Sequence, residues 1–121
     1  MTKKILIVDD DRDIVSAIET ILAFENYSTV SAFTGEDSIE KAKNERPSLI
    51  LLDYMLPDMT GKQVVEEIRK DEEMREIPII LVSATHGLRQ LCQGIAIQGI
   101  IEKPFDIDTL TSTVAKVTAT N

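Results

Sequence analysis

Several residue types that mark particular protein classes are scarce in this sequence. It holds one cysteine, Cys92, no tryptophan, two tyrosines and three phenylalanines. One cysteine excludes an internal disulfide and favours a reducing compartment, and few aromatic side chains argue against a surface that stacks nucleic-acid bases. No apolar run approaches the roughly 18 residues of a membrane span, and MTKKILIVDD turns acidic too early for a signal peptide. We therefore expect a cytoplasmic protein.

Basic residues are also few, with 13 lysines and arginines against 21 aspartates and glutamates, for a net charge of −8. This excess of negative charge argues against direct binding to nucleic acid or to anionic membranes. It favours cations, or proteins with basic surfaces, as binding partners. The length of 121 residues fits one domain with its own core.

Short apolar runs alternate with helical periodicity along the whole chain. The predicted strands are 4–8, 28–32, 49–52, 78–82 and 99–101. Apolar residues at helical spacing follow each strand, over 14–22, 35–45, 64–68, 88–95 and 107–117. Five such pairs predict a doubly wound α/β domain, with helices on both faces of a parallel sheet. The uniformly apolar runs ILIV, LILL and IILV are typical of strands buried on both faces.

A polar residue follows most of these strands where the strand ends. They are Asp9 and Asp10, then Asp53, Ser83 and Lys103. Because the carboxyl ends of parallel strands share one edge of the sheet, we expect these side chains to converge. Clustered carboxylates suit Mg²⁺, and a carboxylate beside a metal can accept a phosphoryl group as an aspartyl phosphate. Mg²⁺ and a lysine would neutralise the phosphoryl oxygens, and a hydroxyl could donate a hydrogen bond to one of them.

Four segments, ILIVDDD, LILLDYMLPDMTG, PIILVSA and IEKPF, occur in this order. Together they resemble the receiver domains of bacterial two-component response regulators, over essentially the whole chain. The resemblance implies a flavodoxin-like (βα)5 fold whose five parallel strands lie in the order 2-1-3-4-5. It implies one receiver domain over 1–121, with no output domain in this chain.

The resemblance also implies a function. The domain would accept a phosphoryl group from a sensor histidine kinase or a histidine phosphotransfer protein, with Mg²⁺ as cofactor and Mn²⁺ as a substitute. It would then switch binding to a downstream protein or output domain through the surface of the fourth helix, fifth strand and fifth helix. Such a domain phosphorylates itself and loses the group slowly, and is not a multiple-turnover enzyme.

The same resemblance assigns roles to residues. Asp53 would be the phosphoacceptor. The metal ligands would be Asp10, Asp53 and the backbone carbonyl of Met55, with Asp9 acting through water. The phosphoryl group would contact Ser83, Lys103 and the backbone N–H of Ala84. The peptide bond before Pro104 is expected to be cis.

This sequence departs from the family pattern in three places. Ile100 replaces the aromatic residue that usually stands three positions before the lysine and moves with the switch. The stretch 83–103 is about two residues short, which predicts a short or irregular fourth helix between residues 86 and 98. Met55 and Thr85, at positions that influence hydrolysis, offer no carboxylate or amide to orient water. We therefore expect a phosphorylated state that is not especially short-lived.

Four further residues receive structural interpretations. Asp11 is expected to cap the first helix, and Asp58 to belong to a turn. His86 is read as exposed and without function, and Cys92 as a core residue.

Three other functions compete with this interpretation. A flavodoxin-like electron carrier needs a Ser/Thr/Gly-rich phosphate loop where this chain has DDDRD. A phosphohydrolase would use an aspartate after the first strand and another two residues on, as at Asp9 and Asp11, but LLDYMLPDMTG and KPF fit the receiver better. A phosphorylation-independent pseudo-receiver that only binds proteins stays open as the alternative.

Overall fold

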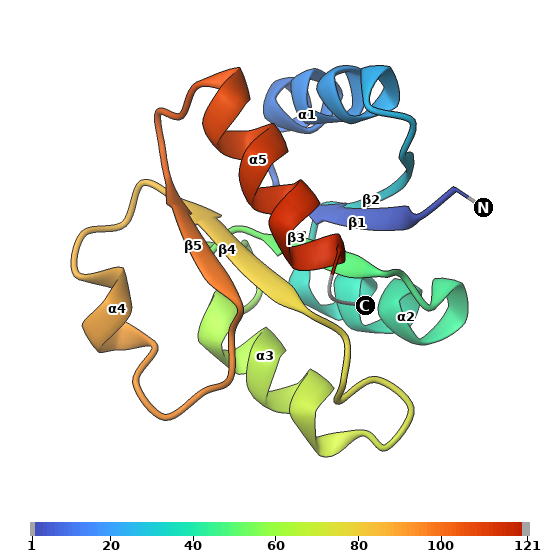
Figure 1. The fold of residues 1–121 in the computed structure, drawn as a ribbon. Helices are drawn as coiled ribbons and strands as arrows, with labels where there is room; N and C mark the ends of the chain where they lie inside the picture. Colours follow the sequence, from blue (N-terminus) through green and yellow to red (C-terminus); the bar gives the residue numbers. More distant parts are fainter. Residues whose placement is uncertain (1, 120–121) are drawn as a thin grey trace.

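A computed structural model describes residues 2–119 of the chain. Five parallel strands form one sheet in the order β2-β1-β3-β4-β5, as the resemblance implied, with helices on both sides (Figure 1). The strands are β1 (Lys4–Val8), β2 (Ser28–Ala32), β3 (Leu49–Leu52), β4 (Ile79–Ser83) and β5 (Gly99–Glu102). The helices are α1 (Arg12–Phe24), α2 (Gly35–Glu45), α3 (Gly61–Lys70), α4 (Leu88–Leu91) and α5 (Ile107–Thr118).

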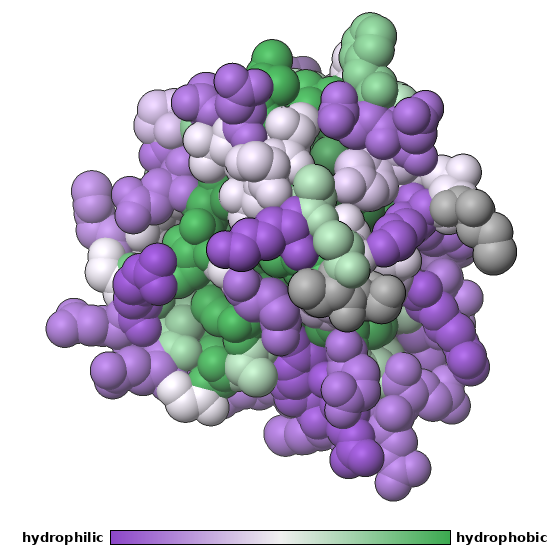
Figure 2. All heavy atoms as spheres, viewed as in Figure 1, coloured by the Kyte–Doolittle hydropathy of each residue, from purple (hydrophilic) through white to green (hydrophobic). Residues whose placement is uncertain are grey.

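The two faces of the sheet carry separate hydrophobic cores. Alternate side chains of a strand point to opposite faces, so in β1 Ile5 and Ile7 join the core beneath α1 and α5. Leu6 and Val8 join the core beneath α2, α3 and α4. Both faces are covered, which explains why the central strands are apolar throughout rather than alternating. Figure 2 shows polar residues over most of one face of the molecule, with apolar residues emerging on the side of α4.

The strand registers bring the carboxyl ends of β1 and β3 side by side. Val8 pairs with Leu52, and the first residue after β3, Asp53, donates its N–H to the Val8 carbonyl at 2.9 Å. On the other side of β1, the Asp9 N–H donates to Ala32 at 3.2 Å. These main-chain bonds continue the ladders past the strand ends. They fix the backbone from which both carboxylates project.

The fourth helix is short, as we expected from the shortened stretch 83–103. It spans only Leu88–Leu91, so the helical spacing that ran on to Ile95 overstated its length. Gly94 has a φ of 86°, a left-handed conformation that suits glycine and turns the chain away from the helical path. Leu88 and Cys92 are nevertheless buried, and Cys92 is a core residue as expected.

Other local predictions are confirmed within a residue. Asp11 caps α1 by accepting hydrogen bonds from the N–H groups of Asp13 and Ile14. β4 begins one residue after Pro78, which has no N–H to give to a ladder, and extends to Ser83. Within residues 2–119, no helix has the length and apolar character needed to cross a membrane.

Candidate functional site

The site is a cluster of three carboxylates at the ends of β1 and β3. Oxygen atoms of Asp9, Asp10 and Asp53 lie within 4.8 Å of one another. Asp9 and Asp53 are buried, with exposed fractions of 4% and 8%, whereas Asp10 is exposed. Like charges at this separation repel each other. The cluster therefore needs a cation for its full ionisation to be stable.

Lys103, which follows β5, supplies one positive charge to this cluster. Its ammonium lies 2.6 Å from Asp9 Oδ2 and 3.4 Å from Asp53 Oδ2. Its backbone N–H donates to the Ser83 carbonyl at 3.0 Å, which holds the lysine at the end of the sheet. The Lys103–Pro104 peptide bond that follows is cis.

The charges in the cluster shift two pKa values. Burial raises the pKa of the Asp53 carboxyl, and nearby Asp9 adds to this effect, against the lowering influence of Lys103 and of the Ser83 hydroxyl. Burial lowers the pKa of the Lys103 ammonium, but its bond to Asp9 and the charge of Asp53 outweigh this and raise the pKa above its usual value. Lys103 is therefore charged at neutral pH.

The donor set of the cluster fits Mg²⁺, which prefers a few carboxylate oxygens and keeps several waters. Three carboxylates against one lysine leave two negative charges for a cation to neutralise. Within residues 2–119, the Asp10 side chain has no hydrogen bond or ion pair, so its oxygens are available. In the same range the Met55 carbonyl accepts no hydrogen bond, although its neighbours Tyr54 and Met59 both do.

Ser83 ends β4 on the other side of Asp53 and is 2% exposed. Its hydroxyl oxygen lies 3.1 Å from Thr85 Oγ1 and accepts the Thr85 N–H at 3.3 Å. The hydroxyl is also close enough to Asp53 to lower the pKa of that carboxyl. Ala84, next in the chain, is exposed. Ser83 thus connects the acidic cluster to the loop that leads into α4.

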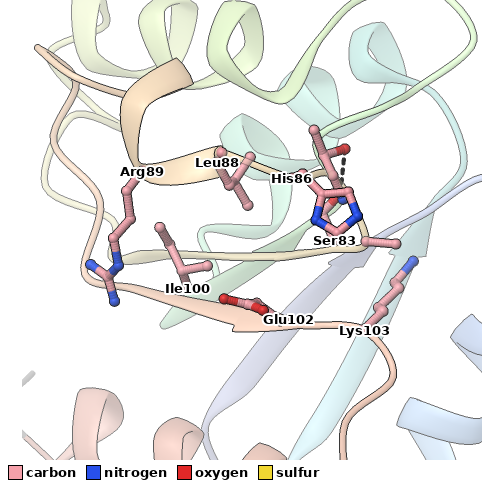
Figure 3. Close-up of a pocket in the computed structure, with 10 residues that line it drawn as sticks. Ser83, His86, Leu88, Arg89, Ile100, Glu102 and Lys103 are labelled. Carbon is pink, nitrogen blue, oxygen red and sulfur yellow. Dashed lines mark hydrogen bonds between the residues drawn. The ribbon is translucent and has the colours of Figure 1, made fainter.

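A cavity of about 240 Å³ lies beside this loop (Figure 3). Ile100 and Leu88 face each other across it, and Ser83 and Lys103 stand at the end nearest the acidic cluster. Ile100 is partly buried against the core beneath α4. His86 is exposed at the cavity mouth. The cavity is thus bounded by Ser83 and Lys103, which lie beside the cluster, and by the first residues of α4.

Sequence reasoning missed one long-range contact beside the site. The sequence predicts Asp58 to be a turn residue, yet its two carboxylate oxygens accept the N–H groups of Gly35 and Glu36 at 2.7 and 3.0 Å. The partners lie more than twenty residues earlier, at the first turn of α2. The acidic residue in the loop was visible, but no local pattern indicates a partner so far along the chain.

Comparisons with known proteins agree with this geometry. Residues 5–115 match the family described as the response regulator receiver domain. The probable transcriptional regulator ycf27 of Porphyridium aerugineum is 32% identical over 117 residues, which are 95% of this chain and 48% of that protein. The alkaline phosphatase synthesis transcriptional regulatory protein PhoP of Bacillus subtilis is 39% identical over 84 residues, 69% of this chain and 34% of that protein. The chain therefore spans about half, or less, of these relatives.

Solved structures share the whole fold. The receiver domain of the sensor histidine kinase PA1611 from Pseudomonas aeruginosa has a TM-score of 0.90 and 27% identity, covering 98% of this chain and 99% of that one. That structure has a magnesium ion coordinated in its active-site cleft. A CheY-like response regulator receiver domain protein from Methanospirillum hungatei has a TM-score of 0.91 and 30% identity, covering 99% of this chain and 96% of that one.

Proposed function

The chain belongs to the response regulator receiver domain family, and from this premise we propose that Asp53 accepts a phosphoryl group from a phosphohistidine. The donor is a sensor histidine kinase or a histidine phosphotransfer protein, and the reaction depends on Mg²⁺. The observation that carries the proposal is the arrangement around Asp53, a buried carboxylate with Asp9 and Asp10 on one side and Lys103 in contact. The Asp53 carboxylate therefore lies beside a positive charge, the Lys103 ammonium, that the protein itself supplies.

The bonds that change in the transfer belong to the Asp53 carboxylate and to the donor. One Asp53 oxygen forms a bond to phosphorus while the bond from phosphorus to the imidazole nitrogen breaks. The leaving nitrogen keeps the electron pair, and the proton already on the other ring nitrogen leaves the histidine neutral. Mg²⁺ held by Asp10, Asp53 and the Met55 carbonyl, with Asp9 through water, would neutralise charge on the phosphoryl oxygens. Mn²⁺ is expected to substitute.

Lys103 and Ser83 connect the modification to the surface. The Lys103 ammonium, already 3.4 Å from Asp53 Oδ2, would pair with a phosphoryl oxygen. The Ser83 hydroxyl and the Ala84 N–H would donate hydrogen bonds to another phosphoryl oxygen. Ser83 would then give up its present hydrogen bonding with Thr85. The cavity between Ile100 and Leu88 gives the loop room to move without an aromatic side chain.

A protein donor has to cover the mouth of the site, and an apolar hollow lies next to it. A cavity of about 400 Å³ is lined almost wholly by apolar surface, from Ile14, Ala17 and Ile21 of α1 and from Pro104 and Phe105 after β5. Lys103 and Ala84 border it. We place the docking of the phosphohistidine protein here, because burial of this apolar area would seat a donor over Asp53.

The output surface in this proposal is formed by α4, β5 and α5. A groove of about 610 Å³ along the edge strand β5 is lined by Ile100 and Val117, with Arg89 and Lys116 at its sides. Arg89 and Lys116 make no ion pair within residues 2–119, although the chain is acidic overall. Downstream proteins are proposed to bind here, without direct contact to nucleic acid, in the cytoplasm. The chain would lose its phosphoryl group slowly and is not a multiple-turnover enzyme.

The first experiment is intact-mass analysis after incubation with acetyl phosphate. We expect a gain of about 80 Da, one phosphoryl group, that requires Mg²⁺ and is lost in Asp53→Asn. The control Asp13→Asn removes an exposed carboxylate of α1 outside the cluster and is expected to leave the gain intact. A folded wild-type protein that shows no gain would overturn the proposal and favour a pseudo-receiver that only binds proteins.

A further inference from the structure

The loop between β3 and α3, residues 53–60, carries both the proposed phosphoacceptor and the proposed carbonyl ligand. Besides Asp53, its buried side chains are Tyr54 and Leu56, each 9% exposed, whereas Met55 is 59% exposed. The Met55 side chain itself therefore adds little burial to the loop. Besides the burial of Tyr54 and Leu56, hydrogen bonds and contacts with neighbouring elements hold the loop in position.

Asp58 supplies the contact on the outer side of this loop. The first N–H groups of a helix lack partners within the helix, and Thr34 satisfies only that of Asp37 with its side chain. Those of Gly35 and Glu36 are taken by the two oxygens of Asp58. The negative carboxylate also lies at the positive end of the α2 dipole. Bonds from Glu36 and Gly35 hold the pKa of Asp58 below its usual value, so it is charged at neutral pH.

Packing at the same joint is close. A Cβ on Gly35 would lie 2.1 Å from Met59 Cγ, so the loop occupies the space that a side chain at position 35 would take. The absence of a Cβ at Gly35 thus lets the loop reach the helix end. Asp58 and Met59 together attach the outer turn of the loop to α2.

Hydrogen bonds within the loop connect its attached outer turn to Met55. The Leu56 N–H donates to the Met59 carbonyl at 3.3 Å, and the Gly61 N–H donates to the Tyr54 carbonyl at 2.5 Å. Met55 and Thr60 pair between these two bonds as an isolated antiparallel bridge. The loop is therefore a small closed unit, and a displacement of Asp58 moves Met55 with it.

We propose that Asp58 is a positioning residue for the metal site: by docking this loop on the first turn of α2, it holds the Met55 carbonyl where a divalent cation needs it. Asp58 touches neither the metal nor the phosphoryl group. This inference rests on the proposed function, because it takes Met55 as a ligand. A loop that is docked for only part of the time lowers the apparent affinity by that fraction.

The test is an NMR titration of the full chain with Mg²⁺ alone, following the backbone amides of Asp10, Asp53 and Met55. We expect Asp58→Ala to weaken Mg²⁺ binding about three- to tenfold, with a loop that docks for a tenth to a third of the time. Amide hydrogen exchange at Gly35 and Glu36 is expected to speed up in the same variant. Asp58→Asn has the same net charge as Asp58→Ala but keeps one acceptor oxygen. Its Mg²⁺ affinity is expected to fall between those of Asp58→Ala and the wild type.

The matched control is Asp71→Ala. Asp71 is also a carboxylate that accepts a backbone N–H, that of Glu73 at 2.8 Å, but it follows α3 at the far end from the site. Its loss changes net charge equally and is expected to leave Mg²⁺ affinity within twofold of the wild type.

Three results would overturn the inference. If Asp58→Ala and the wild type bind Mg²⁺ with equal affinity, the role of Asp58 is overturned and the proposed metal site is not. Equal weakening in Asp58→Asn and Asp58→Ala, or in Asp71→Ala, would assign the effect to net charge. If the amides of Asp53 and Met55 in the wild type do not respond to Mg²⁺, the proposed metal site itself fails, and this inference fails with it.

Discussion

Lys103 Nζ lies 2.6 Å from Asp9 Oδ2, closer than its 3.4 Å approach to Asp53. The lysine that is proposed to meet the phosphoryl group on Asp53 is thus held chiefly by the neighbouring carboxylate. Both partners are largely buried, with side-chain exposures of 15% and 5%. A buried charge that loses its partner is costly, so this contact contributes to the stability of the metal-free protein.

Lys103→Met is expected to lower the free energy of unfolding by about 1–3 kcal/mol in the absence of divalent cations, since it leaves buried carboxylates without their cation. Added Mg²⁺ is expected to recover most of the loss, because it can replace the missing positive charge. Urea unfolding with and without Mg²⁺ measures both effects. Lys116→Met removes an exposed lysine and the same charge; a similar loss in that variant would contradict the explanation.

The ionisation of Asp53 is expected to make the free energy of unfolding depend on pH. Its pKa is raised in the folded protein, chiefly by burial. The folded state therefore binds more protons than the unfolded state in the interval between the ordinary pKa of an aspartate and this raised pKa. In that interval stability falls as pH rises, and ionised Asp53 destabilises the metal-free protein at neutral pH.

Asp53→Asn removes this ionisation. We expect the variant to be more stable than the wild type at pH 7 without Mg²⁺, and the difference to shrink as pH falls toward the ordinary pKa of an aspartate. Urea unfolding of both proteins across this pH range gives the difference directly. A difference that grows on acidification would show that Asp53 is stabilised, rather than strained, by its surroundings.

The fold and the acidic cluster were both predictable from this sequence, for a shared physical reason. Strands buried on two faces are apolar without interruption, so LILL and ILIV mark their own ends, and the first polar residue after each is the residue at the sheet edge. The docking of Asp58 on α2 was not predictable. It joins a loop to a helix end more than twenty residues away. The local sequence around Asp58 is equally compatible with a simple turn that makes no such contact.

The length of α4 shows a second limit. The apolar spacing from Leu88 to Ile95 is helical, but the chain leaves the helix after Leu91 and turns at Gly94. Arg69 of α3 is one of the residues that hold the segment after the turn. Its guanidinium donates to the carbonyls of Ala96 and Ile77 at 2.8 and 2.7 Å. A tertiary contact of this kind leaves no local pattern.

Arg69→Ala is accordingly expected to cost about 2–3 kcal/mol of unfolding free energy, because several hydrogen bonds from a charged, half-buried group are lost at once. Arg69→Lys keeps the charge without the fork of donors and should recover only part of the loss. Chemical denaturation measures both. The neighbouring Lys70→Ala breaks only an exposed ion pair with Glu67 at 3.5 Å and should change stability by less than about 0.5 kcal/mol. Equal losses at the two positions would refute the role of Arg69.

The lifetime of the phosphorylated state depends on what can orient water beside Asp53. Met55, two residues after Asp53, is exposed and offers a thioether, and Thr85, two residues after Ser83, offers a hydroxyl, so neither side chain has a carboxylate or an amide. We therefore expect phosphorylated wild-type protein to keep its phosphoryl group far longer than seconds once acetyl phosphate is removed.

Met55→Asn keeps the backbone carbonyl but adds an amide that can hold an attacking water by hydrogen bonds. We expect loss of the phosphoryl group to become several-fold faster, as measured by intact mass at timed intervals. Met55→Leu, which matches the methionine in apolar character and size, is expected to keep the wild-type rate. Faster loss in both variants would mean that the methionine shields Asp53 from water by packing, so that side-chain cover, and not a missing amide, sets the lifetime.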